Sequence, residues 1–309
     1  MHPIQTLNDT SWLPKWTETD LFSKLNREQL KKVMEASKRV HRWGNFALTD
    51  EVITKITSLV DRNRAPNETV EDLLERILDE FLHIDWNEYL DETGRVVGGL
   101  PDDGNVYDHS KWQTAIIKKY WKLDVKWLYI SESEYIVLKI LALIHDIGEI
   151  GLWDILYGDK SEDKEIIEQK LGEVLLFSLF KGGVLSSSEE KLLERIYEIN
   201  FDKEHPLYKI FTNYEKLSYM QWAISAYKNR KQINKPIALI HNVLGNQIKP
   251  LLSRWLSVPA IESFLKFHSN DIDIMFDYVD NSWFQNDSEE RNSMYEEAKE
   301  LWQDSKFKN

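Results

Sequence analysis

The sequence predicts an all-α protein, because its apolar residues follow helical spacing, helix-start residues precede them, and strand patterns are scarce. Between Leu21 and Met34, for example, apolar residues recur at the spacing of one helix face. Convincing strand alternation is confined to residues 94–98. The 309 residues are 42% hydrophobic and 29% charged, so the chain can bury a substantial core.

The first third of the chain predicts three helices. Thr19-Asp20 begins the first of them, which runs to about Val40 and ends near Gly44, a residue suited to a helix C-cap. Amphipathic stretches at 50–60 and 69–84 predict the second and third helices. Residues 91–104 are rich in glycine but lack the spacing of a phosphate-binding loop, so they predict a loop or a short hairpin.

The rest of the chain predicts eight more helices and a loop at 151–160. The second of these helices is strongly apolar, and the fourth follows Ser186, a good N-cap residue. Their expected ranges are 107–121, 134–145, 162–180, 186–199, 206–229, 237–256, 259–276 and 289–306.

Charge and composition exclude several classes of function. The formal net charge of −13 argues against a broad grip on nucleic-acid backbone, although local cations still permit a small phosphorylated substrate. The absence of cysteine excludes disulfides, thiolate zinc sites and a cysteine nucleophile. With no apolar run of spanning length and no signal-peptide pattern at the start, the expectation is a cytoplasmic protein without a membrane span.

The stretch from Leu141 to Glu149 combines an apolar run with polar residues that are costly to bury. The run ends abruptly in His145 and Asp146, and Glu149 follows three residues later. Burying His145 and Asp146 together is unfavourable unless something pairs with them, and a divalent metal ion would do so. Adjacent helical residues point about 100° apart, so both can bind one ion only near a helix end or with help from other segments.

Further ligands of the same type occur at a distance in the sequence. His109 precedes His145 by 36 residues, and Glu215 follows Asp146 by 69 residues. Together the four side chains predict a site of imidazole and carboxylate ligands for one divalent metal ion, of a kind that suits Mn, Co, Ni, Fe, Zn or Mg. A metal ion with an open position would activate water and polarise a phosphate group.

These motifs resemble the HD-domain phosphohydrolases, and most of all the bacterial 5′-deoxynucleotidases among them. The matching motifs are Asp108-His109-Ser110, Ile144-His-Asp-Ile-Gly-Glu149 followed by Trp153-Asp154, Glu215-Lys-Leu217, and a weaker basic and aromatic element, Lys38 to Gly44. The resemblance implies an HD-domain helical bundle over roughly 105–230 with extra helices at both ends. It also implies removal of phosphate from a nucleotide such as a deoxynucleoside monophosphate.

The resemblance also assigns roles to single residues. His109, His145, Asp146 and Glu215 would hold the metal ion, while Glu149 would orient or deprotonate the attacking water. Asp154 would handle protons or orient the substrate, and Gly158-Asp159 is the alternative match to this motif four residues later. The substrate would be bound by Arg42 at its phosphate, by Trp43 at its sugar or base, and by Lys160.

The expected organisation is an N-terminal helical segment with an insertion (1–104), an HD core (105–232) and a C-terminal helical extension (233–309). Glu215 stands where the family has Asp, which leaves open a catalytically weakened protein that binds a nucleotide or a partner protein. A nuclease or cyclic-nucleotide phosphodiesterase ranks lower, because no spare histidine for a second metal ion is evident near the core. The aromatic residues after Pro236 leave open packing against the core or a homodimer.

Overall fold

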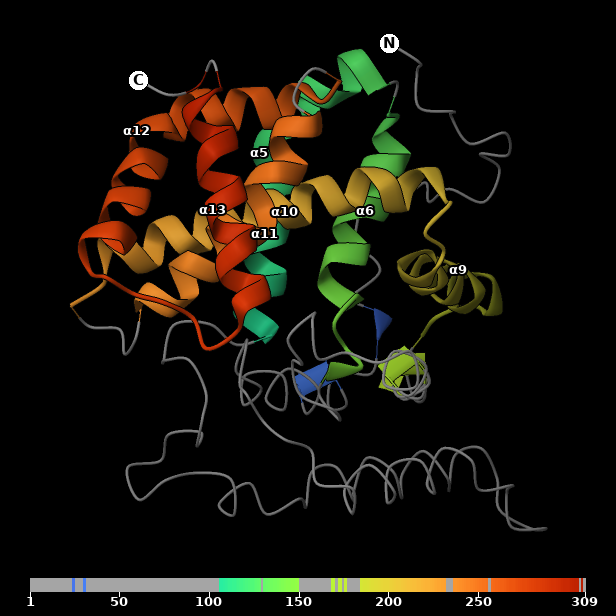
Figure 1. The fold of residues 1–309 in the computed structure, drawn as a ribbon. Coiled ribbons are helices and arrows are strands. Elements are labelled where there is room, and N and C mark those ends of the chain that lie inside the picture. The colour runs from blue at the N-terminus through green and yellow to red at the C-terminus, as the bar shows by residue number, and fades with distance from the viewer. Residues whose placement is uncertain are drawn as a thin grey trace, which may run out of the picture. The chain divides into compact units, whose positions relative to one another are not determined.

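The protein is helical wherever the computed structural model describes regular structure (Figure 1), and no strand occurs in the described residues. The prediction of an all-α fold is therefore confirmed over this part of the chain. It comprises residues 24–25, 30–31, 106–128, 130–149, 168–169, 172–173, 175–176, 184–231, 236–254, 257–305 and 307. The helices that can be delimited within these residues are α5 (Val106–Leu128), α6 (Glu132–Ile144), α9 (Ser187–Glu198), the 3-10 helix η3 (Ile199–Phe201), α10 (Pro206–Lys228), α11 (Pro236–Arg254), α12 (Pro259–Asn281) and α13 (Glu289–Gln303).

Helix α9 begins at the cap residue that its sequence predicts, whereas the cap of α10 was not predicted. Ser186 is the N-cap of α9, and its backbone N–H donates to the Glu189 carboxylate at 2.8 Å. His205 caps α10, where its Nδ1 accepts from the Leu207 amide at 3.2 Å and Pro206 occupies the first turn. The predicted helices that begin near 50 and 69, and the hairpin near 94–98, lie outside the described residues.

Two helices run further than their sequence patterns predicted. Helix α5 was expected to end at Trp121 but continues to Leu128, and α12 was expected to end at Phe276 but continues to Asn281. Both extensions contain buried side chains, Asp124 at 0% exposure and Val279 at 1%. Burial of these residues stabilises the turns by which the two helices are extended.

The chain divides into two compact units that alternate along the sequence. One unit contains Trp112–Leu138 and Glu204–Asn309, and the other contains Lys139–Lys203 with the described residues up to Lys111. Domain boundaries at 104 and 232, and an HD-type bundle, stay predictions. None of the described helices has the length and apolar character that a membrane span requires.

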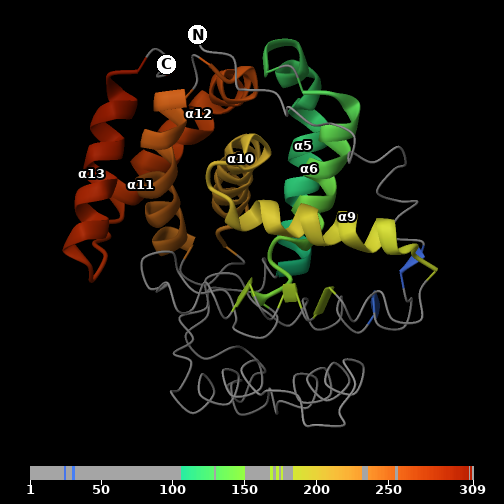
Figure 2. The same ribbon diagram turned by 90° about the vertical axis from the view of Figure 1, so that its right-hand side faces the viewer.

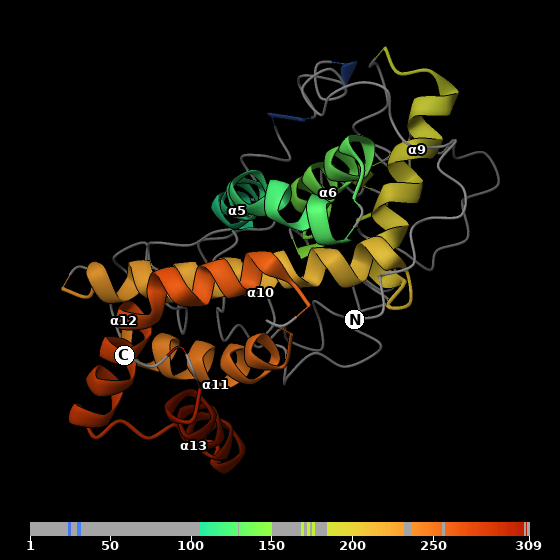
Figure 3. The ribbon, with the colours of Figure 1, turned by 90° about the horizontal axis from the view of Figure 1, so that it is seen from above.

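In the unit that contains the C-terminus, α11 lies between α10 and α13 (Figures 2 and 3). The helices approach closely at Gly245 on α11, where a Cβ atom would lie 3.2 Å from the backbone nitrogen of Tyr295. Trp302 on α13 is buried and donates its indole N–H to Asp273 on α12 at 2.7 Å. These contacts join α11, α12 and α13 around one core.

Asp124 joins α5 to two later helices of the same unit. Its carboxylate accepts from the Tyr214 hydroxyl of α10 at 2.8 Å and from the Ala260 amide, in the first turn of α12, at 2.9 Å. The N-cap of α12 is Val258, which has no side-chain acceptor of its own, so Asp124 satisfies an amide that the helix start leaves open. Burial raises the pKa of the Asp124 carboxyl to about 6, while the two hydrogen bonds act against this shift.

We expect the stability difference between the wild type and Asp124→Asn to depend on pH. A carboxyl group whose folded pKa lies above its ordinary value favours folding most at low pH, and this contribution is lost as pH rises from about 4 to about 6. The wild type should therefore gain roughly 3 kcal/mol relative to Asp124→Asn as pH falls through that window. Urea unfolding of both proteins at several pH values measures the difference, and a flat difference between pH 4 and 7 would contradict the assignment.

Gln113 on α5 is a buried polar side chain of a different kind. It is 0% exposed, and neither its Nε2 nor its Oε1 has a hydrogen-bond partner in the described part of the chain. A buried donor or acceptor without a partner costs about 1–3 kcal/mol. Gln113 therefore lowers the stability of the fold that contains it.

Replacement of Gln113 by methionine, which is similar in size, should raise the free energy of unfolding by about 1–3 kcal/mol, because no unsatisfied amide is then buried. Gln303→Met is the matched control, since Gln303 is exposed on α13 and the change there should stay within about 0.5 kcal/mol. Chemical denaturation of both variants gives the comparison. A loss of stability in Gln113→Met would show instead that the amide group is satisfied in solution.

Candidate metal centre

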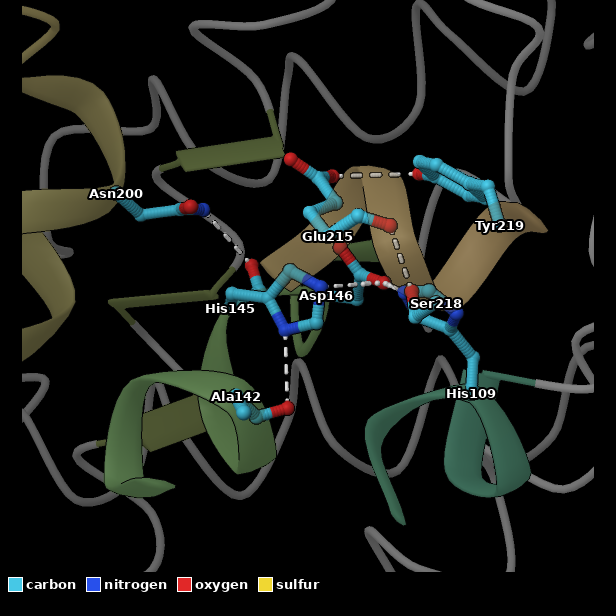
Figure 4. Close-up of polar contacts among 8 residues, drawn as sticks. All are labelled: His109, Ala142, His145, Asp146, Asn200, Glu215, Ser218 and Tyr219. Carbon is cyan, nitrogen blue, oxygen red and sulfur yellow. Dashed lines mark hydrogen bonds and ion pairs between the residues drawn. The ribbon is translucent and has the colours of Figure 1, made fainter. Parts of the chain in front are cut away.

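Three of the predicted metal ligands lie together in one buried cluster (Figure 4). The Nε2 atom of His145 lies 3.0 Å from Oδ2 of Asp146, and the Nε2 atom of His109 lies 3.6 Å from the same oxygen. All three side chains are buried, with exposures of 7% for His109, 2% for His145 and 8% for Asp146. Their ligand atoms lie within 4.8 Å of one another, so the cluster could hold a metal ion.

The end of α6 explains how two adjacent residues reach the same point. The buried apolar residues of α6 continue to Ile144, the last residue of the helix, and His145 and Asp146 follow in a turn. The turn is closed by backbone hydrogen bonds from Ile147 to Ile144 at 3.1 Å and from Glu149 to Asp146 at 3.0 Å. The helix end thereby relieves the angular separation that would keep two consecutive helical side chains apart.

The orientation of His145 suits a metal ligand. Its Nδ1 lies 3.0 Å from the carbonyl oxygen of Ala142 (Figure 4). A carbonyl oxygen only accepts, so Nδ1 carries a proton, and Nε2, which faces Asp146, is the nitrogen that can bind a cation. Metal-binding histidines commonly have their second nitrogen fixed in this way. The donor set and the tautomer therefore fit a divalent cation that binds imidazole and carboxylate.

Carboxylates make the surroundings of the cluster negative. Burial raises the pKa of the Tyr197 hydroxyl well above its ordinary value, and the charges of Glu168, Glu173, Asp146 and Glu149 raise it further. The Tyr197 hydroxyl therefore stays protonated, and it lies 3.4 Å from the carbonyl oxygen of Gln169, to which it donates. Such a concentration of acidic groups in the interior favours a cation.

Two glycines allow the segment around Glu168 to pack against the turn that carries the ligands. A Cβ atom at Gly148 would lie 2.2 Å from the Glu168 carbonyl oxygen, and one at Gly172 would lie 3.2 Å from a methyl group of Ile147. Glu168 itself is 4% exposed. Sequence reasoning missed this residue, because an acidic residue in an amphipathic helix is usually solvated.

Glu149, the predicted general base, directly follows the turn that contains His145 and Asp146. Its side chain is 4% exposed, and its backbone N–H donates to the carbonyl oxygen of Asp146 at 3.0 Å. Its chemical role stays a prediction. Asn200 was also missed by sequence reasoning, and its side-chain amide donates to the carbonyl oxygen of His145 at 3.0 Å (Figure 4).

The predicted fourth ligand, Glu215, belongs to α10 in the other compact unit. Its carboxylate accepts from the Tyr219 hydroxyl at 3.2 Å, and its carbonyl oxygen accepts from the Ser218 hydroxyl at 2.8 Å (Figure 4). Binding of Glu215 to the same ion stays a prediction. The predicted substrate and proton-handling residues lie outside the described part of the chain, and they are Arg42, Trp43, Asp154 and Lys160.

Comparison with known proteins gives no family for this chain: no protein-family model, no curated protein and no solved structure matches it. The site is therefore defined by its own residues and geometry.

Replacement of His145 by alanine should remove bound metal, because the remaining imidazole and carboxylate no longer make a three-ligand cluster. Asp146→Asn, which keeps the size of the side chain, should lower the metal content as well. Elemental analysis after dialysis against Co²⁺ or Mn²⁺ measures this content, with circular dichroism to verify folding.

A buried histidine outside the cluster supplies the control for these variants. His268 Nδ1 lies 2.9 Å from Asp271 Oδ2, so His268→Ala also removes a buried histidine paired with an aspartate but should keep the metal. Wild-type metal content in both His145→Ala and Asp146→Asn would refute the site.

Proposed function

We propose that this protein is a metal-dependent phosphohydrolase that removes phosphate from a small nucleotide. The observation that carries the proposal is the buried cluster of His109, His145 and Asp146. Two imidazoles beside one carboxylate are typical ligands of Mn, Co, Ni, Fe and Zn, and less commonly of Mg. The chain offers no thiolate, because it contains no cysteine.

A divalent cation in such a centre lowers the pKa of water and polarises a phosphoryl oxygen. The protein's own side chains would orient that water and take its proton. Glu149 is the candidate for this role, because it is buried and its backbone is bonded to Asp146 in the turn that carries two ligands. A carboxylate serves as a general base when it is within one hydrogen bond of the water.

The remaining roles in the proposal come from the resemblance to HD-domain phosphohydrolases. Glu215 would complete the ligand set, and Asp154 would handle protons or orient the substrate. Arg42, Trp43 and Lys160 would bind the nucleotide, since a guanidinium matches phosphate oxygens in a two-point contact and an aromatic ring packs on a sugar or base. The choice of a nucleotide as substrate rests on this resemblance.

A second candidate is a protein that binds a nucleotide or a partner protein but hydrolyses weakly. It is favoured by Glu215, which stands where the resembling family has the shorter aspartate. A longer side chain at a ligand position changes the distance between carboxylate and backbone by one methylene group. Binding with little turnover is the expected behaviour of such a centre.

Phosphate release distinguishes the two candidates. The protein, supplied in turn with Mn²⁺, Co²⁺, Ni²⁺, Fe²⁺, Zn²⁺ and Mg²⁺, is assayed against all nucleoside mono-, di- and triphosphates. The proposal expects turnover of at least one of them. Stoichiometric metal bound to the protein, with no turnover of any nucleotide, would contradict the enzyme proposal and favour the binding protein.

In the same assay, Glu149→Gln should keep the bound metal and lose about 10²- to 10⁴-fold in turnover, because a positioned general base contributes a factor of this size. Glu173→Gln is the control, since Glu173 also lies in the acidic surroundings of Tyr197 but is half-buried and has no assigned role. Full activity of Glu149→Gln would end its assignment as the base.

A further inference from the structure

The peptide group between His145 and Asp146 controls the geometry of the proposed centre. The two residues are consecutive, so the directions of both side chains follow from this one peptide and its neighbours. Their ligand atoms, Nε2 of His145 and Oδ2 of Asp146, are 3.0 Å apart only because the helix ends at Ile144. Any rotation of this peptide moves both ligands at once.

The carbonyl groups at this helix end have identifiable donors. Those of Leu141 and Ala142 accept from His145 itself, through its backbone N–H at 2.8 Å and its Nδ1 at 3.0 Å. The carbonyl of Ile144 accepts from Ile147. The carbonyl of His145, which belongs to the critical peptide, accepts instead from a side chain 55 residues later, the Nδ2 group of Asn200 at 3.0 Å.

Asn200 is held in place by the core of its own unit. It lies in η3, directly after α9, between Ile199, which is buried, and Phe201, whose ring packs edge-on against Tyr197 at 5.2 Å. Helix α9 is itself anchored by buried Leu193 and Ile196. The amide of Asn200 is therefore presented from a packed segment and not from a mobile side chain on the surface.

We propose that Asn200 is a positioning residue for the metal centre. It fixes the His145–Asp146 peptide through the His145 carbonyl, and so sets the directions of two ligands, without binding the metal or the substrate itself. Asparagine suits this role because its amide donates to a carbonyl and brings no charge that would compete with the cation. Outer residues that orient metal ligands typically change metal affinity by about 10- to 100-fold when they are replaced.

The proposal is tested by Co²⁺ binding, measured by calorimetry and by the visible absorption of the bound ion, with Asn200→Ala and Asn200→Leu. Both variants remove the donor, and leucine keeps the side-chain volume. Each should bind Co²⁺ about 10- to 100-fold more weakly than the wild type, with an altered absorption spectrum at saturation. Asn200→Gln, which keeps an amide donor, should recover part of the affinity.

A purely structural role predicts a different outcome: a lower melting temperature of the metal-free protein with unchanged Co²⁺ affinity and spectrum. That result, or affinity within twofold of the wild type in both variants, would overturn the proposal. Asn229→Ala, at the C-cap of α10, is the control and should leave Co²⁺ binding unchanged.

Because the role of Asn200 rests on the metal centre of the proposed function, the two must be separable. Wild-type protein that binds Co²⁺ but releases no phosphate from any nucleotide overturns the proposed enzyme and still allows the Asn200 test. Wild-type protein that binds no Co²⁺ overturns both.

Discussion

The burial of one carboxylate between two imidazoles is the constraint on which the centre depends. Polar groups of this kind are unfavourable in a protein interior unless they are paired, and a charged carboxylate is the most unfavourable of them. His109, His145 and Asp146 are each less than a tenth exposed, and their ligand atoms converge. A bound cation would turn this unfavourable burial into a source of stability, because it offsets the charge at the point where the three side chains meet.

The burial of these three ligands accounts together for the end of α6 and for the glycine in the turn that follows it. Helix α6 ends at Ile144, whereas a continued helix would direct His145 and Asp146 to different sides. The turn that follows lacks a side chain at Gly148, where the backbone of Glu168 approaches. A centre of this kind needs ligands on firm elements and support from residues that bind no metal.

The sequence predicted well those features that depend on local patterns. The all-α class follows from helical spacing, and α10 begins and ends within a residue of its predicted range because Pro206 marks its start. The cluster of His109, His145 and Asp146 could be predicted because the chemistry of burial demands partners for a histidine and an aspartate at the end of an apolar run. By contrast, Asn200 and Glu168 acquire their importance only from tertiary contacts, which no short pattern records. The extension of α5 likewise depends on tertiary contacts. Asp124 can be buried in the added turns because it accepts hydrogen bonds from Tyr214 and Ala260.

The alternation of the two units along the chain has a consequence for biosynthesis. Once residue 203 has been made, every segment of the unit that holds the cluster exists, whereas the other unit still lacks α10 to α13. Domains generally fold as units during synthesis from the N-terminus. The three side chains of the cluster can therefore meet while the last 106 residues (204–309) are still to be added. Asp124, by contrast, would be enclosed later, because its partners Tyr214 and Ala260 both lie after residue 203.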